Sequence, residues 1–225
     1  GTVVAVEPVE RLDRHLWKGK CHEVLGPEEE TGVQEEVVKI LKDIPRSFPK
    51  NVLAAAEALP EHPDPEEVRS RHDLRDRLFV TIDGAAAKDF DDAIYVEATR
   101  QGYILYVAIA DVSHYVEPGG QLDQEARTRS NSFYFPNSVE PMFPSALSTG
   151  LCSLNPDADR LVMTVKLKFN RAGDVLEQEF FSAVIRSKAR LTYSRVKQAL
   201  LDNDHEEQER MGEVYPMLRS AEALA

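Results

Sequence analysis

The sequence predicts an α/β fold, in which a mixed β-sheet with flanking helices follows a smaller, partial β unit. Short runs of apolar, β-branched and aromatic residues recur between residues 78 and 184, which is typical of strands. Helical patterns lie before and after these runs. Hydrophobic residues make up 42% of the 225 residues and charged residues 29%, as in a folded globular chain and unlike a disordered one.

The first segment, residues 1–25, contains two short strand patterns, at 2–7 and 20–25. Two strands are too few for an independent domain, so this segment is interpreted as the end of a small β unit.

Three short helices are predicted next. Thr31 and Gln34 have the spacing of a capping box, and Pro45 ends the first helix. The second is an alanine-rich helix over residues 50–59. The third begins with Asp64 as its N-cap and Pro65 at its first position.

The sheet is predicted from the segments that follow. Three apolar strands and a hairpin with glycine in its turn are expected, and then a polar helix. These elements span residues 78–82, 93–97, 103–110, 161–169 with 175–184, and 193–211.

The charge balance limits the function classes. The chain carries 39 acidic and 27 basic residues, a net charge of −12, which argues against binding nucleic acid through bulk positive charge. No apolar run is long enough to cross a membrane, and no secretion signal is visible. Only two cysteines are present, without metal-binding spacing, so both are expected to be reduced thiols in a cytoplasmic protein.

Four aspartates, Asp83, Asp89, Asp91 and Asp92, lie within ten residues where an apolar strand ends. Carboxylates this close repel one another unless cations or protons neutralise them. Mg²⁺ prefers carboxylate and phosphate oxygens, and a pair of such ions suits phosphodiester hydrolysis by activating water and stabilising the leaving oxygen. The pattern therefore favours a two-metal Mg²⁺ site, although a solvated acidic turn is the plainer alternative.

Two other aspartate motifs were compared with this segment. A calcium loop starting at Asp83 would need glycine where Lys88 stands and glutamate where Ile94 stands, so that motif is excluded. A phosphatase with an aspartyl nucleophile would have its Asp-x-Asp pair directly after the strand, whereas Asp89 follows Ala87 and Lys88. A phosphatase stays open only as a weaker alternative.

Five motifs, in order, resemble the catalytic domain of the RNase II/RNase R family of exoribonucleases. Their residues resemble the RNase R branch of that family more than the RNase II branch. They are DLRD (73–76), TIDGAAAKDFDDA (81–93), VAIADVSHYV (107–116), YFP with VEPM (134–142) and LSTGLCSLNP (147–156). The resemblance implies an RNB-type catalytic domain over residues 73–225. It also implies that residues 1–25 are the end of a cold-shock or OB-like β-barrel domain and that residues 26–72 are a helical linker.

This resemblance implies processive 3′ to 5′ hydrolysis of single-stranded RNA to nucleoside 5′-monophosphates with Mg²⁺. It assigns the metal ions to Asp83, Asp89, Asp91 and Asp92, and makes Asp91 the residue whose loss stops cleavage while sparing RNA binding. It assigns the stacking of terminal bases to Tyr134, and stacking on an aromatic ring accepts any base.

The sequence departs from the family pattern in two respects. Many members carry an acidic residue where Ala85 and Ala86 stand here. The family domain also continues beyond residue 225, so the rest of it, and further RNA-binding domains, are expected to be missing from this chain. The chain is therefore expected to be inactive alone. A non-catalytic RNA-binding module is the rival interpretation, in which the aspartates are only structural.

One basic cluster lies near the end of the chain. It holds Lys188, Arg190 and Tyr193, together with Arg186, Arg195 and Lys197. Contact with RNA phosphates is the functional interpretation, a solvated face is the alternative, and Tyr193 could equally be a core residue.

Asp111 and His114 could approach the aspartates, although a structural role as a turn cap or an interior hydrogen bond is the commoner use of such residues. Residues 76–199 contain 14 basic and 16 acidic side chains. Once the four site aspartates are neutralised, this segment is mildly basic, so the acidity of the whole chain does not exclude RNA.

Overall fold

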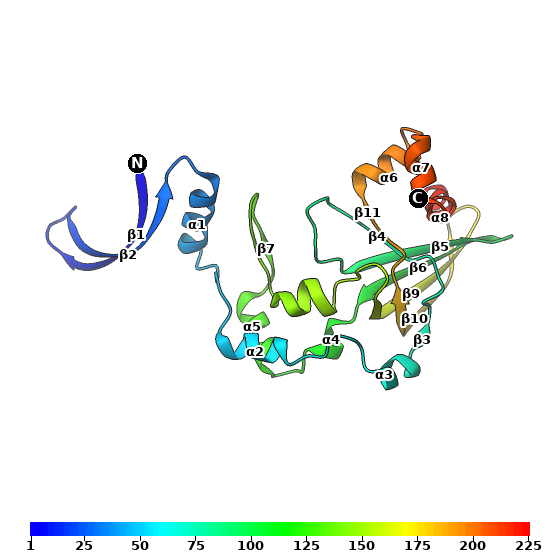
Figure 1. Cartoon of the computed structure of the whole chain (residues 1–225), viewed down its shortest axis with the longest axis horizontal. Helices are drawn as coiled ribbons and strands as arrows, with labels where there is room; N and C mark the ends of the chain where they lie inside the picture. The colour runs from blue at the N-terminus through cyan, green and yellow to red at the C-terminus, as the bar shows by residue number, and fades with distance from the viewer.

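The computed structural model describes all 225 residues and contains a seven-stranded mixed sheet (Figure 1). The strand order is β11-β4-β5-β6-β9-β10-β3; β11 with β4 and β10 with β3 are parallel, and the other pairs are antiparallel. The predicted mixed α/β class is confirmed. The strands are β3 (His72–Asp73), β4 (Val80–Asp83), β5 (Asp92–Ala98), β6 (Gly102–Ala110), β9 (Asp159–Asn170), β10 (Val175–Arg186) and β11 (Ala189–Thr192).

Three helices cover one face of the sheet (Figure 1). They are α6 (Tyr193–Leu200), α7 (His205–Met211) and α8 (Val214–Leu224), and they bury Met211, Met217 and Leu218 against Val80 and Val96.

The single helix predicted over residues 193–211 is therefore wrong. Asn203 has a positive φ of 54°, which ends the first helix, and the Asp204 carboxylate accepts hydrogen bonds from the backbone N–H of Glu206 and Glu207, which starts the next one.

The opposite face of the sheet packs on the segment that carries the π-helix η1 (Ala146–Leu151). Phe79, Leu147, Leu154 and Ile185 are fully buried in this core. The core lies directly beneath the loop between β4 and β5, because Phe90 of that loop is one of its members.

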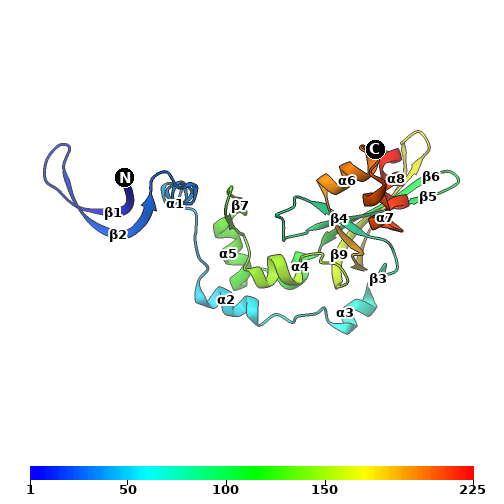
Figure 2. The same cartoon turned by 45° about the horizontal axis from the view of Figure 1, so that its top comes forward.

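The N-terminal part of the chain consists of a two-stranded antiparallel hairpin, three short helices and an extended connection between the first two helices. The hairpin and the first helix lie apart from the sheet, whereas the third helix leads directly into β3 at the sheet's edge (Figures 1 and 2). The elements are β1 (Thr2–Arg11), β2 (Trp17–Pro27), α1 (Thr31–Leu41), α2 (Lys50–Glu57) and α3 (Pro65–Ser70).

Only one of the two predicted helix caps forms here. The Asp64 carboxylate accepts a hydrogen bond from the Glu66 N–H at 2.6 Å, as predicted for α3. The capping box at Thr31 is wrong, because Thr31 is already helical and the cap position belongs to Glu30, whose side chain makes no cap hydrogen bond.

Between β6 and β9 the chain forms elements that the sequence patterns did not predict. These are α4 (Val112–Tyr115), α5 (Gln121–Arg129) and a small hairpin made of β7 (Phe133–Tyr134) and β8 (Val139–Glu140). The chain contains no helix with the length and apolar character needed to span a bilayer.

A buried ion pair fastens the end of β6 to the N-terminal helices. Arg71 and Asp111 lie 2.7 Å apart, and their side chains are 7% and 6% exposed. Asp111 also caps α4, accepting from the His114 N–H, and accepts from the Ser113 hydroxyl at 2.6 Å. Burial alone would raise the pKa of Asp111, but the hydrogen bonds from Ser113 and Arg71 outweigh it and lower the pKa below its ordinary value.

Asp111→Asn is expected to lower the free energy of unfolding by about 3 kcal/mol, because it leaves the buried Arg71 guanidinium without one of its partners. Chemical denaturation of both proteins near pH 7 measures this. Asp202→Asn is the control, since the Asp202 carboxylate lies 3.6 Å from Lys197 in an exposed pair worth under about 1 kcal/mol. Equal losses of unfolding free energy in both variants would contradict a stabilising role for the buried pair of Arg71 and Asp111.

The same pair predicts a pH dependence. A carboxylate with a lowered folded-state pKa stabilises the protein above its unfolded-state pKa of about 3.9, and this contribution is lost as the pH falls below that value. The difference in unfolding free energy between the wild type and Asp111→Asn should therefore shrink as the pH is lowered from 5 toward 3. A constant difference over this range would argue against an ionised Asp111.

Candidate functional site

The four predicted site aspartates lie on one loop of the sheet. Asp83 is the last residue of β4, Asp92 is the first of β5, and Asp89 and Asp91 lie in the connection between them. Because β4 and β5 are neighbouring antiparallel strands, the two ends of this connection, the aspartate loop (residues 83–92), meet at the same edge. Asp91 and Asp92 are exposed, and Asp83 and Asp89 are partly buried.

The backbone of the aspartate loop is fixed from below by the segment after η1. The Ser153 hydroxyl donates to the Lys88 carbonyl at 3.0 Å and accepts from the Phe90 N–H at 3.1 Å. The Leu154 N–H donates to the Phe90 carbonyl at 2.7 Å. With the Phe90 ring buried in the core, these bonds hold the backbone of residues 88–90 in one conformation.

Arg190 fixes the first half of the aspartate loop. It lies on β11, which runs parallel to β4, and its Nη2 donates to the carbonyls of Gly84 and Ala85 at 2.9 and 2.7 Å. A third, longer contact reaches the Ala87 carbonyl at 3.5 Å. The guanidinium carbon also lies 5.4 Å from the centre of the Phe90 ring, a cation–π distance. Arg190 therefore acts on the backbone of this loop in the structure.

The electrostatics of the aspartate loop favour a bound cation. Burial, followed by the neighbouring Asp92 and Asp91 carboxylates, raises the pKa of Asp83. Partial burial and Asp91 likewise raise the pKa of Asp92. The Asp83 Oδ2 atom is buried without any hydrogen-bond partner, and such an orphaned carboxylate oxygen suits a hard divalent cation.

The carboxylates are close but do not meet at one point. Nowhere in the structure do three His, Cys, Asp or Glu side chains converge as ligands of one metal ion. The fit to Mg²⁺ consequently rests on the kind of ligands present, on their mutual repulsion and on the unpaired Asp83 oxygen.

Tyr134, to which the resemblance assigns base stacking, lies beside this loop. Its hydroxyl donates to the Asp89 carboxylate at 2.5 Å, and this bond, followed by burial, raises the pKa of Tyr134 to about 12. Despite this hydrogen bond, Tyr134 is 67% exposed. Next to it is a groove of about 570 Å³, lined by Lys88, Asp89, Tyr134, Phe135, Pro136, Asn137, Ser145, Ser148 and Thr149, among others.

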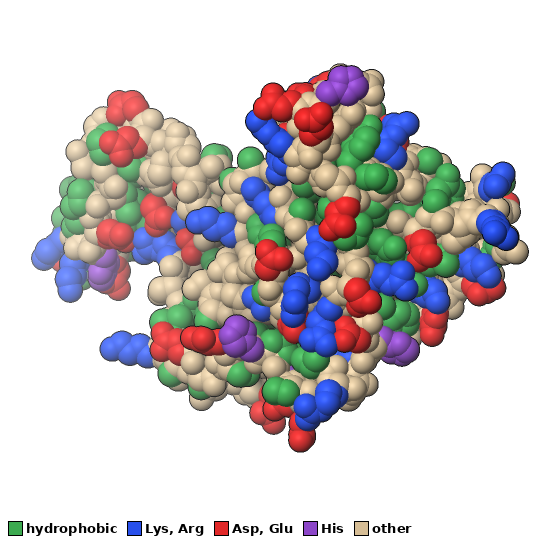
Figure 3. Space-filling view, turned by 45° about the vertical axis from the view of Figure 1, so that its right-hand side comes forward, with side chains coloured by type: hydrophobic (Ala, Val, Ile, Leu, Met, Phe, Trp, Pro, Cys, Tyr) green, Lys and Arg blue, Asp and Glu red, His purple; other side chains and the backbone are tan.

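The predicted basic cluster is largely occupied by ion pairs. Arg186 pairs with Asp159 at 2.7 Å, Arg195 with Glu207 at 2.5 Å and Lys197 with Asp202 at 3.6 Å. On the face seen in Figure 3, basic and acidic side chains are accordingly interspersed.

The three remaining members of the cluster differ from these. Neither Lys188 nor Arg190 makes an ion pair within 4 Å, but Arg190 donates to loop carbonyls, so Lys188 is the cation without a side-chain partner. Tyr193 is 65% exposed, so the alternative of a core residue is wrong. The predicted contact of Lys188, Arg190 and Tyr193 with RNA stays a prediction.

Asp111 and Ser153 both have structural roles, but the sequence suggests such a role only for Asp111. Asp111 is a helix cap and ion-pair partner, which is the structural alternative considered for it. Ser153 lies within one of the five motifs that carry the resemblance, but its residue type does not mark it as part of a site. Its position inside LSTGLCSLNP was the available signal, but its bonds to residues 63 and 65 positions earlier follow only from the fold.

The chain is similar to known proteins in both sequence and fold. Residues 71–225 match the RNB domain family. The chain is 43% identical to ribonuclease R of Vibrio cholerae over 220 residues, covering 97% of this chain and 27% of the relative. It is 46% identical to ribonuclease R of Escherichia coli over 211 residues, covering 92% of this chain and 26% of the relative. The chain thus spans about a quarter of the length of these relatives.

The solved structure of Mycoplasma genitalium RNase R in complex with ribose methylated single-stranded RNA is also similar. It matches with a TM-score of 0.86 and 34% identity, and the match covers 99% of this chain and 35% of that one. The resemblance inferred from the five motifs is therefore confirmed. Since the family match includes more than half of its residues, the chain belongs to the RNB domain family, and the relatives named above are ribonucleases R.

Proposed function

We propose that this chain is part of a 3′ to 5′ exoribonuclease that hydrolyses single-stranded RNA processively to nucleoside 5′-monophosphates. The observation that carries the proposal is the aspartate loop, in which Asp83 and Asp92 have raised pKa values and a buried Asp83 oxygen has no partner. Carboxylates that are destabilised by their own proximity are the natural ligands of divalent cations. Membership in a family with ribonuclease R relatives supports RNA as the substrate.

Asp83, Asp89, Asp91 and Asp92 would hold two Mg²⁺ ions in this proposal. Bound there, the metals supply the Lewis acidity that activates water and stabilises the leaving oxygen of the phosphodiester. The protein's own part is to keep the carboxylates in place, and it does so through backbone hydrogen bonds from Ser153, Leu154 and Arg190. Those three residues bind backbone groups of the loop and do not use its carboxylate oxygens, of which one on Asp89 accepts from the Tyr134 hydroxyl.

Tyr134 would stack on a base at the 3′ end of the RNA. Its ring is exposed beside the groove, while its hydroxyl is tied to Asp89. Stacking does not depend on base identity, which suits an exonuclease. The solved RNase R complex with ribose methylated single-stranded RNA supports a binding path for a single strand in this fold.

Asp91→Asn in the full-length protein is expected to abolish release of mononucleotides in Mg²⁺ while the dissociation constant for a single-stranded RNA changes less than about threefold. The substitution removes a proposed metal ligand but keeps the Tyr134 ring and the basic side chains that would bind RNA. Chromatography of the products, with and without EDTA, and a binding titration measure both quantities. Asp202→Asn is the matched control and should behave as the wild type. Undiminished release by Asp91→Asn, or release that survives EDTA, would contradict the two-metal proposal and leave a non-catalytic RNA-binding module or a phosphatase to be tested.

Lys188 and Arg190 are expected to respond differently to substitution. Lys188→Ala should weaken RNA binding and lower the slope of log affinity against log salt by about 0.7, the value for one phosphate contact on a single strand. Arg190→Ala should instead reduce kcat by about a hundredfold, because a displaced aspartate loop misaligns the reacting groups. Lys50→Ala, an exposed lysine of α2 far from the loop, controls for loss of charge. An unchanged salt slope in Lys188→Ala would remove Lys188 from the RNA path.

The isolated 225-residue chain is expected to release no mononucleotides from RNA in Mg²⁺, since it spans about a quarter of the relatives that carry the activity's name. The full-length protein at equal concentration is the comparison. Robust exonuclease activity of the isolated chain would show that the residues described here suffice.

A further inference from the structure

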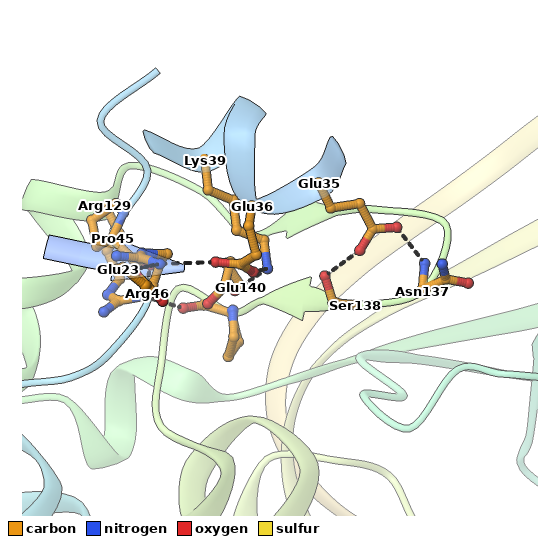
Figure 4. A network of polar contacts seen from close by, with 11 residues as sticks. Glu23, Glu35, Glu36, Lys39, Pro45, Arg46, Arg129, Asn137, Ser138 and Glu140 are labelled. Carbon is orange, nitrogen blue, oxygen red and sulfur yellow. Dashed lines mark hydrogen bonds and ion pairs between the residues drawn. The ribbon is translucent and has the colours of Figure 1, made fainter. Parts of the chain in front are cut away.

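The helix α1 is joined to the β7–β8 hairpin by a buried lysine (Figure 4). The Lys39 side chain is only 3% exposed and pairs at 2.7 Å both with Glu36 on its own helix and with Glu140 on β8. Its ammonium also lies 5.1 Å from the centre of the Phe135 ring. Since a charge is buried only at high cost unless it is paired, these contacts fix where α1 lies on the hairpin.

Glu35 holds the tip of the same hairpin. One of its carboxylate oxygens accepts from the Asn137 N–H at 2.8 Å and the other accepts from the Ser138 hydroxyl at 2.8 Å (Figure 4). Glu35 is 6% exposed, so both bonds are sheltered from water. This carboxylate faces the hairpin and has no ion-pair partner, which identifies the hairpin turn as what it binds.

The hairpin itself is too short to be rigid. Its ladder has two residue pairs, Phe133 with Glu140 and Tyr134 with Val139, closed by one bond from the Phe135 N–H to the Ser138 carbonyl. An isolated two-stranded hairpin is marginal in water. Its conformation therefore depends on the contacts that α1 makes with residues 135–140.

A second buried cation fixes the base of the hairpin to the linker. Arg129 is 4% exposed, and its guanidinium donates to the carbonyls of Pro141, Pro45 and Ser47. It also lies over the Phe48 ring at 3.6 Å. With its base fixed by Arg129 and by the pair of Lys39 with Glu140, the hairpin's remaining freedom is at its tip, where Glu35 acts.

We propose that Glu35 and Lys39 are positioning residues for Tyr134, so that α1 determines how the Tyr134 ring meets the last base of the RNA. The inference rests on the proposed function, in which Tyr134 stacks on that base. The connection is continuous: α1 contacts residues 135–140, these continue β7, and the Tyr134 hydroxyl reaches Asp89 of the aspartate loop.

The test uses full-length protein carrying Asp91→Asn, with an RNA whose 3′-terminal base is the fluorescent analogue 2-aminopurine. Stacking on tyrosine quenches this base, so the fluorescence reports the contact itself. Glu35→Ala should lose most of the quenching and raise the dissociation constant about fivefold to tenfold, within the range for one lost stacking contact. Glu35→Gln should restore both values to within about twofold, because its amide can accept from Asn137 and donate to the Ser138 oxygen.

Glu30→Ala is the matched control, since it removes a carboxylate from the start of α1 that makes no contact with the hairpin. The decisive comparison is made in a Tyr134→Ala background. If Glu35 acts through Tyr134, Glu35→Ala adds no further loss there. Full quenching in Glu35→Ala, or an equal loss of affinity with and without Tyr134, would overturn the proposal.

A second measurement separates this proposal from the proposed function because it needs no RNA. The ¹⁹F resonance of 3-fluorotyrosine placed at position 134 of the full-length protein should shift or broaden in Glu35→Ala and return in Glu35→Gln. An unchanged resonance in Glu35→Ala would overturn the positioning role even if the wild type degrades RNA. A shifted and rescued resonance would uphold it even if the wild type releases no nucleotide.

Discussion

Mutual repulsion among the carboxylates between β4 and β5 is the constraint on which the site depends. After burial, the Asp92 and Asp91 carboxylates raise the pKa of Asp83, and Asp91 raises that of Asp92, so a free loop would relax by spreading the carboxylates apart. The surroundings resist this through the backbone: Ser153 and Arg190 bind carbonyl and N–H groups of the loop. The protein thus keeps its negative charge concentrated where a cation can neutralise it.

Contacts from the N-terminal segment also reach the aspartate loop, by way of the β7–β8 hairpin. Buried charges on α1 meet the hairpin, the hairpin carries Tyr134, and Tyr134 donates to Asp89. Each link pairs a charged group with a specific partner, so the arrangement is directional where apolar packing alone would not be. The isolated position of β1 and β2 in Figure 1 therefore does not mean that the N-terminal part is independent of the site.

Much of the fold could be predicted from the sequence, because strands and capped helices leave local patterns. Apolar runs marked β5 and β6, the hairpin with glycine in its turn marked β9 and β10, and the Asp64 cap placed α3. The break between α6 and α7 was missed because a polar run reads as one helix unless the left-handed residue at Asn203 is recognised. Short strands such as β7 and β11 carry too few residues to show any period.

Some residues of the candidate site could be identified from the sequence, and others could be identified only from the fold. The aspartates and Tyr134 could be named from motifs, since the residues of the proposed site stand in recognisable order within them. The roles of Ser153, Arg190, Glu35 and Lys39 could not, because their partners lie far away along the chain and are backbone atoms or buried charges that composition does not reveal. Arg190 illustrates this: its residue type predicted phosphate, whereas its neighbour in space is a turn of main chain.

The hydrogen bonds that hold the aspartate loop join residues far apart in the sequence, which affects how the protein folds as it is made. Ser153 lies 63 residues after its partner Phe90, and Arg190 lies 106 residues after Gly84. Contacts so distant in sequence form late, because the intervening chain must first be synthesised and folded. During translation the aspartate segment emerges long before β11 does. The growing chain therefore carries its cluster of negative charge unrestrained, and the aspartate loop becomes ordered among the last parts of the sheet.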